Sequence, residues 1–222
     1  MSRSIHLMVF TLCVTLSAAA AWAGEDISKV NGSIQAEAGR PYGSLETVNG
    51  AIRIADAARA GAASTVNGSI DLGRSAQAER LETVNGAIRI ARDAQVAKGV
   101  ETVNGGVFVD RGGTVGGDVE TVNGAIGLVG TRVGGGVRTV NGDVTIGVGS
   151  HVRGGILIER SSSWFQAMPR RRTRVVIGPD AVVEGPLVFR REVDLHVHRS
   201  ARIGPVSGAE AMLYDSDTAP RN

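Results

Sequence analysis

Cysteine and aromatic residues are scarce in this sequence. Its 222 residues include one cysteine, Cys13, six prolines and 4% aromatic residues, whereas glycine contributes 31. A single cysteine excludes a disulfide framework within the chain and a metal centre built from several cysteines. High glycine without high proline or a Gly-X-Y period argues against collagen, and a hydrophobic content of 42% argues against a disordered chain.

The first residues have the pattern of a secretory signal peptide. Arg3 precedes an apolar run from Ile5 to Leu16, and a small-x-small tripeptide follows at residues 21–23, so we expect residues 1–23 to be removed. A retained membrane anchor is the alternative, but the run is shorter than the ~20 residues of a span. Cys13 lies too early, and after too large a residue, for lipid attachment. The mature chain is expected in the periplasm, on the outer surface or secreted, without a transmembrane span.

Positive and negative charges are nearly balanced. Removal of Arg3 from 24 basic residues leaves 23 against 22 acidic residues, a net charge of +1. This balance provides no basis for predicting a nucleic acid partner.

The tripeptide Val-Asn-Gly occurs seven times, and its asparagines are 18, 18, 18, 19, 19 and 18 residues apart. An aliphatic residue follows each asparagine by three positions. A second aliphatic column, which includes Ala60, Ala78, Val96, Val115, Val133 and Val152, lies about half a period further on. A period near twenty residues is typical of repeat architectures.

This repeat predicts an all-β fold, a single-stranded parallel β-helix or solenoid with 18–19-residue coils. Coils would stack at the strand spacing of ~4.8 Å, with the aliphatic residues inside. We expect glycine after asparagine to supply a positive φ. The sequence LETVNGAIRI, at residues 45–54 and again at 81–90, would then be one segment seen two coils apart. The asparagines would form a structural ladder at one corner: Asn31, Asn49, Asn67, Asn85, Asn104, Asn123 and Asn141.

An antiparallel hairpin meander is the alternative, because Asn-Gly is the strongest two-residue hairpin signal. In a hairpin, Leu45, Thr47 and Ile52 would share one face, and Val84 would lie outside. One-residue changes of the period favour the solenoid, because each would reverse the strand faces of a meander.

Changes in the repeat pattern divide the chain into segments. After the signal peptide, residues 24–158 carry the Val-Asn-Gly coils, residues 159–174 form an inserted loop, and residues 175–206 have hexapeptide-like coils. Residues 207–222 form a C-terminal tail or a cap. Residues 24–206 are expected to form one continuous solenoid of roughly nine to eleven coils.

The Val-Asn-Gly-x-Ile coils resemble bacterial exported putative adhesin domains. The corners "VGGDV", "VRGGI" and "IGPDAVVEG" are similar to those of bactofilins, polymer-forming bacterial scaffold proteins. The resemblance covers about residues 27–206. It implies a right-handed solenoid and a structural or adhesive role in the cell envelope. Bactofilins are typically cytosolic, whereas this chain carries an export signal.

No arrangement of residues indicates catalysis, and we predict no enzyme, cofactor site or metal site. His196 and His198 alternate on an expected strand, where they are either metal ligands or two solvent-facing residues. The inserted loop suggests a contact with an anionic envelope component such as lipid, lipopolysaccharide or glycan. Alternatively, its aromatic residues cover the rod and its arginines are solvated. The contact residues would be Trp164, Phe165, Arg170, Arg171, Arg172 and Arg174.

Three functions fit these features. The first is an exported, non-enzymatic, adhesin-like protein of the cell envelope that presents a rigid rod. The second is a scaffold that self-associates through the open ends of its solenoid. The third is a polysaccharide-active β-helix enzyme, which would need a groove lined by three or more close carboxylates or basic groups.

Overall fold

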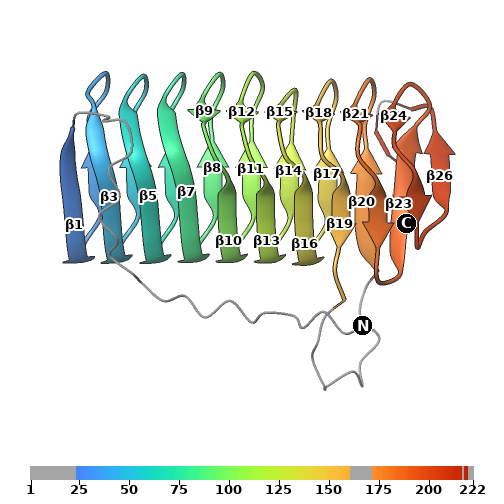
Figure 1. Cartoon of the computed structure of the whole chain (residues 1–222), viewed down its shortest axis with the longest axis horizontal. Coiled ribbons are helices and arrows are strands. Elements are labelled where there is room, and N and C mark those ends of the chain that lie inside the picture. The colour runs from blue at the N-terminus through green and yellow to red at the C-terminus, as the bar shows by residue number, and fades with distance from the viewer. Residues whose placement is uncertain (1–23, 161–171, 217, 220–222) are drawn as a thin grey trace.

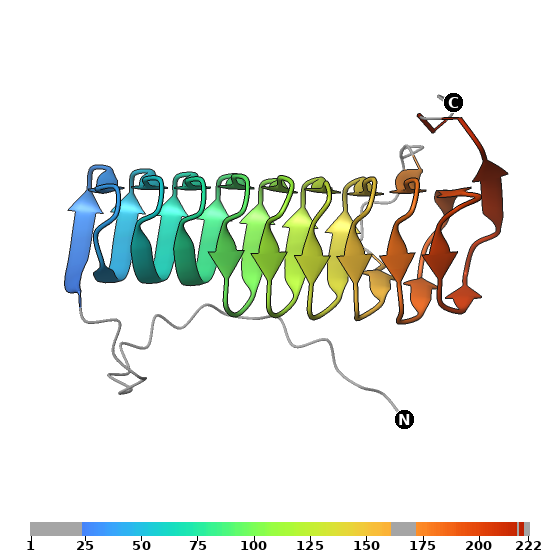
Figure 2. The same ribbon diagram turned by 90° about the horizontal axis from the view of Figure 1, so that it is seen from above.

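The computed structural model describes residues 24–160, 172–216 and 218–219. These residues form strands and turns and contain no helix, so none of them forms a helix that could span a membrane. The strands stack in parallel, coil on coil, into a rod that follows the chain order from end to end (Figure 1). Seen from above, the coils lie in single file (Figure 2). The predicted parallel solenoid is confirmed, and the alternative hairpin meander is wrong.

One side of the rod is a ten-stranded sheet with one strand per coil, here called sheet B. Ten coils lie within the predicted range of nine to eleven. The strands, in spatial order, are β2 (Ile34–Ala36), β4 (Ile52–Ile54), β6 (Ile70–Leu72), β8 (Ile88–Ile90), β11 (Val107–Val109), β14 (Ile126–Leu128), β17 (Val144–Ile146), β20 (Thr173–Ile177), β23 (Val193–His198) and β26 (Ala211–Tyr214).

The other strands form a sixteen-stranded sheet, here called sheet A. Its first strands are long: β1 (Glu25–Asn31), β3 (Tyr42–Asn49), β5 (Arg59–Asn67) and β7 (Gln77–Asn85). Each later coil has two short strands in place of one long strand. The first of each pair is β9 (Gln95–Val96), β12 (Thr114–Val115), β15 (Arg132–Val133), β18 (His151–Val152), β21 (Val182–Val183) and β24 (Arg202–Ile203). The second is β10 (Val100–Asn104), β13 (Val119–Asn123), β16 (Val137–Asn141), β19 (Ile156–Ile158), β22 (Leu187–Phe189) and β25 (Val206–Ser207).

The change from one strand to two coincides with an added residue. The spacing Asn67 to Asn85 is 18, whereas Asn85 to Asn104 is 19. The extra residue lies in the bend at residues 97–99, between β9 and β10, and β7 pairs with both of these strands. Sheet A is therefore folded along this bend into two flanks. We call them the short-strand flank (β9, β12, β15, β18, β21 and β24, with the first residues of β5 and β7 in register) and the Asn flank (β10, β13, β16, β19, β22 and β25, with the last residues of β3, β5 and β7 in register).

Like residues stack on like residues in the core. Ile34, Ile52, Ile70 and Ile88 follow one another in register on sheet B, and all are essentially inaccessible to solvent. The second predicted column is equally buried, from Ala60 to Val152. Alternation along each short strand places these side chains inside and their neighbours outside. The core is thus a set of aliphatic columns that run along the rod axis.

In the Val-Asn-Gly motif, the valine does not face the core. The preceding threonine is the buried residue. In five of the six repeats that have it, its hydroxyl donates to the glycine carbonyl of the previous coil, as Thr83 does to Gly68 at 2.9 Å, whereas the buried Thr139 hydroxyl has no such bond. The valine faces outward and is partly exposed, 38% at Val66. An outward Val84 therefore does not distinguish the hairpin from the solenoid, because both folds place it outside.

The glycine after asparagine is needed for close approach rather than for positive φ. Only the first and last of the seven, Gly32 and Gly142, have a positive φ, so the expectation is wrong for the others. A Cβ atom at Gly86 would lie 1.9 Å from the carbonyl oxygen of Gly68 in the coil below. Most residues with a positive, left-handed φ lie instead in the turns that follow the strands of sheet B from β2 to β20. These residues are Gly39, Ala57, Ser75, Asp93, Gly112, Gly130, Gly149 and Asp180.

Candidate functional site

The outer surface of the short-strand flank carries a column of side chains along the rod that are polar except for Val182. Strand pairing places in register Arg59, Gln77, Gln95, Thr114, Arg132, His151, Val182 and Arg202. Because the pairing is parallel, equivalent side chains recur once per coil, about 4.8 Å apart. The column contains arginines, amides, a hydroxyl and an imidazole, but no carboxylate.

A groove of about 530 Å³ lies over the middle of this column. Gln77, Gln95, Thr114 and Arg132 line it, together with His151 and Arg153. Its floor contains Gly116 and Gly134, which lack side chains beside the longer glutamines and arginines. These glycines follow from stacking, since a Cβ at Gly116 would lie 2.1 Å from the carbonyl oxygen of Ala97. The bend that folds sheet A thus contributes Ala97, Gly116 and Gly134 to the groove.

Two cations in this groove have no acidic partner. Neither Arg132 nor Arg153 forms an ion pair or a side-chain hydrogen bond within the described part of the chain, and both are exposed. His151 differs, because its Nε2 lies 2.7 Å from Oε1 of Glu184, which lies outside the groove lining. The lining itself contains no Asp or Glu, so the groove is a positively charged surface with unused hydrogen-bond donors.

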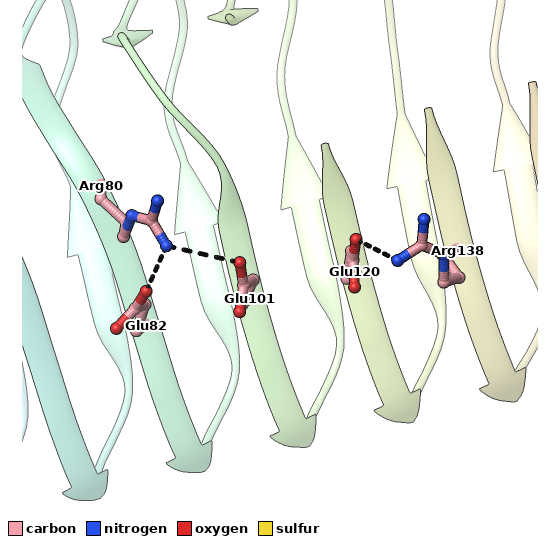
Figure 3. A network of polar contacts seen from close by, with 5 residues as sticks. All are labelled: Arg80, Glu82, Glu101, Glu120 and Arg138. Atoms are coloured by element: carbon pink, nitrogen blue, oxygen red, sulfur yellow. Dashed lines mark hydrogen bonds and ion pairs between the residues drawn. The ribbon is translucent and has the colours of Figure 1, made fainter. Parts of the chain in front are cut away.

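The outer surface of the Asn flank carries acids and arginines in contact with one another. Glu82, Glu101 and Glu120 stand on adjacent coils in register. Arg80 contacts Glu82 at 2.8 Å and Glu101 at 3.6 Å, and Arg138 contacts Glu120 at 2.7 Å (Figure 3). Burial, and then the neighbouring Glu82 and Glu120, raise the pKa of Glu101. Each of these three acids thus has an arginine nearby, whereas Arg132 and Arg153 of the groove have no acidic partner in the described residues.

Replacing Glu101 should stabilise the protein near neutral pH. A carboxyl with a raised pKa in the folded state destabilises the fold as pH rises from its ordinary value of 4.5 through the folded value. We expect E101Q to raise the free energy of unfolding at pH 7 by less than about 1 kcal/mol, because the site is partly solvated. The gain should vanish below about pH 4. Urea unfolding at both pH values measures it, and a gain that persists in acid would contradict the electrostatic cause.

The seven asparagines form the ladder at the corner between the Asn flank and sheet B. From Asn49 onward, each Nδ2 donates to Oδ1 of the asparagine one coil earlier, which gives six bonds of 2.9–3.0 Å. The ladder ends at Arg191, whose Nη1 donates to Oδ1 of Asn141 at 2.8 Å. This position makes Arg191 a structural residue that the repeat pattern did not indicate.

An interruption of this ladder should have a modest effect. N85A removes the bond from Asn85 to Asn67 and the bond from Asn104 to Asn85. We expect a loss of about 1 kcal/mol in the free energy of unfolding, since the amides are largely exposed. N31A is the matched control, because Asn31 makes one ladder bond and should lose less. Equal losses in the two variants would argue against additive ladder bonds.

The predicted contact cluster in the inserted loop lies only partly in the described residues. Trp164, Phe165, Arg170 and Arg171 fall outside them. The Arg172 guanidinium is 3.2 Å from Glu192 and 3.6 Å from Asp194, so it is neutralised by acids of β23 and the turn before it.

Arg174 is not part of the inserted loop, contrary to the prediction. It belongs to β20, where its backbone N–H donates to Oδ1 of Asp143 in the coil below. The insertion ends before Thr173, because the buried Thr173 already occupies a strand position.

His196 and His198 both lie on β23 but differ in environment. His196 is 3% exposed, so the prediction of two solvent-facing residues is wrong for it. Burial, and then the nearby Arg174, lower the pKa of His196, which favours the neutral ring. His198 packs edge-on against Tyr214 and contacts Oγ of Ser200. Residues 24–160, 172–216 and 218–219 contain no group of three potential metal ligands.

No family model matches the chain, and comparison with curated proteins and with solved structures finds no match. The solenoid is therefore established by its geometry alone. The similarity to adhesin domains and bactofilins remains a resemblance of motifs.

Proposed function

We propose that this chain is an exported, non-enzymatic, adhesin-like protein of the bacterial cell envelope. In this proposal the solenoid is a rigid support, and its short-strand flank binds an anionic envelope component. Export is inferred from the signal-peptide pattern of residues 1–23. The resemblance of the coils to exported adhesin domains supports the same assignment.

The observation that supports this proposal most is the pair of uncompensated arginines in an acid-free groove. Arg132 and Arg153 face the groove from adjacent coils, whereas Arg172 and the arginines of the Asn flank contact carboxylates. A groove without carboxylates also favours binding over hydrolysis, because most glycoside hydrolases use a pair of carboxyl groups. The preferred contact therefore moves from the inserted loop to the short-strand flank.

Two measurements test this function. Fractionation of cells that express the tagged chain should place the protein outside the cytoplasm, without residues 1–23. Purified protein should bind isolated bacterial envelopes in a salt-sensitive manner, and R132Q/R153Q should bind about tenfold more weakly. R53Q/R89Q is the control on sheet B, where both arginines lie beside Asp71. A cytoplasmic protein, or equal losses in both variants, would contradict the proposal.

A self-associating scaffold is the second candidate, and the last coil favours it. Leu213 of β26 is 63% exposed and Met212 is 45% exposed at the C-terminal end of the rod. At the other end, Lys29 of β1 occupies the register position of the buried Thr47. A charge at such a position discourages strand pairing at an open edge. Association would therefore use the C-terminal end and stop at dimers.

Light scattering over a range of protein concentrations separates the two candidates. The scaffold predicts a dimer that L213E converts to a monomer, since a carboxylate would be placed in an apolar contact. A monomer at all concentrations would eliminate the scaffold and leave the binding proposal unchanged.

A further inference from the structure

The groove on the short-strand flank is elongated along the rod axis. Its lining comes from five successive coils, at residues 77–78, 95–97, 114–116, 132–134, and 151 with 153. Four strand spacings of ~4.8 Å separate the first coil from the last, so the groove extends about 19 Å. A compact ligand would fill only part of it, whereas an extended polymer parallel to the axis can contact every coil.

The groove offers one polar side chain per coil at a constant interval. Gln77 and Gln95 present amides, and neither makes a side-chain hydrogen bond within the described residues. Thr114 adds a hydroxyl in the next coil. The strand spacing is close to the length of one pyranose unit in an extended polysaccharide. Hydroxyl groups that repeat at this interval are suitable partners for amides and hydroxyls.

Charge is concentrated at one end of the groove. Arg132 and Arg153 lie in its last two coils, and the guanidinium group binds carboxylates through two parallel hydrogen bonds. The other end is uncharged and suits sugar hydroxyls. At Gly116 and Gly134 the lining has no side chain, which leaves space for a ribbon-like chain. A membrane surface would instead meet protruding side chains and would not reach these glycines.

We propose that this groove binds a linear carboxylated polysaccharide that lies along the rod axis, with about one sugar unit per coil. This inference rests on the proposed function and specifies the ligand of the same site. Recognition combines guanidinium–carboxylate pairs at Arg132 and Arg153 with hydrogen bonds from Gln77, Gln95 and Thr114.

Calorimetric titration of the purified chain with oligogalacturonates of two to eight units tests the length of the site. Affinity should rise with each added unit up to about five units and then remain constant, since the groove spans five coils. Neutral malto-oligosaccharides of the same lengths should bind at least about tenfold more weakly. Affinity that is independent of chain length, or equal for neutral oligomers, would overturn the proposal.

Two substitutions locate the ligand. T114E places a carboxylate in the centre of the groove on an outward, partly exposed position, and should weaken binding at least about tenfold through like-charge repulsion. T145E makes the same change on the exposed face of β17 in sheet B and should leave binding unchanged. Circular dichroism confirms that both variants fold. Equal binding by wild type and T114E would refute the groove as the site.

Further ligands separate this inference from the proposed function. Dextran sulfate and vesicles of anionic phospholipid are titrated against wild type, R132Q/R153Q and T114E. If the wild type binds vesicles but not oligogalacturonates, and both variants lose vesicle binding, the polysaccharide is not the ligand. The groove would then still be the binding site of the proposed function. Tighter binding of dextran sulfate than of oligogalacturonates would show that the groove prefers sulfate to carboxylate, and would contradict the inference. Failure to bind envelopes and all three ligands would refute both proposals.

Discussion

L81D is expected to unfold the protein or to lower its free energy of unfolding by more than about 4 kcal/mol. Leu81 lies at the centre of β7, has no exposed surface, and stacks between Ala63 and Val100 in the adjacent coils. A carboxylate at this position would be buried among aliphatic columns without a partner. Urea unfolding followed by circular dichroism measures the loss.

V84D is the matched control three residues along the same strand. Val84 faces outward between the Glu and Asn positions, so its carboxylate remains solvated. We expect a loss of less than about 1 kcal/mol. Comparable losses in L81D and V84D would show that the assignment of strand faces in β7 is wrong.

G86A is expected to lower the free energy of unfolding by about 3 kcal/mol. The new Cβ would lie 1.9 Å from the carbonyl oxygen and 2.5 Å from the carbonyl carbon of Gly68. Both atoms belong to the backbone, so no side chain can move aside, and the two coils must separate. Thermal unfolding and urea unfolding both report this loss.

G127A provides the control for glycine replacement. Gly127 lies on the outer face of β14, where the nearest atom to a new Cβ would be Cδ2 of Phe108 at 3.2 Å. Phe108 is an exposed side chain that can shift, so we expect a change within about 0.5 kcal/mol. A neutral G86A would contradict the close stacking of the Asn-Gly turns.

The core was predictable because each coil repeats the same local pattern. The aliphatic residue three positions after each asparagine, such as Ile52 or Ile88, occupies an inward position on sheet B in every coil. The second column was predictable for the same reason. Changes of one residue in the period are absorbed in bends, such as residues 97–99, and do not alter the register of the strands.

Other features required knowledge of which residues become neighbours. The inward threonine had a signal in the sequence, since threonine precedes Val-Asn-Gly in six of seven coils, but its bond to a glycine carbonyl depends on the stacking distance. The groove depends on the alignment of Gln95, Thr114 and Arg132 across strands of different coils. Which group an arginine contacts depends on residues distant in the sequence: Arg191 contacts the Asn141 amide, and Arg172 contacts the carboxylates of Glu192 and Asp194.

Pulsed electron spin resonance on R59C/R202C, in a Cys13→Ser chain, tests the central claim most directly. Both positions are exposed in the polar column of the short-strand flank, and seven strand spacings separate them. Stacked coils predict that the labelled backbone positions are about 34 Å apart. In a hairpin meander each repeat would contribute two adjacent strands, so the labelled positions would be about twice as far apart. That distance would contradict both the rod and its groove.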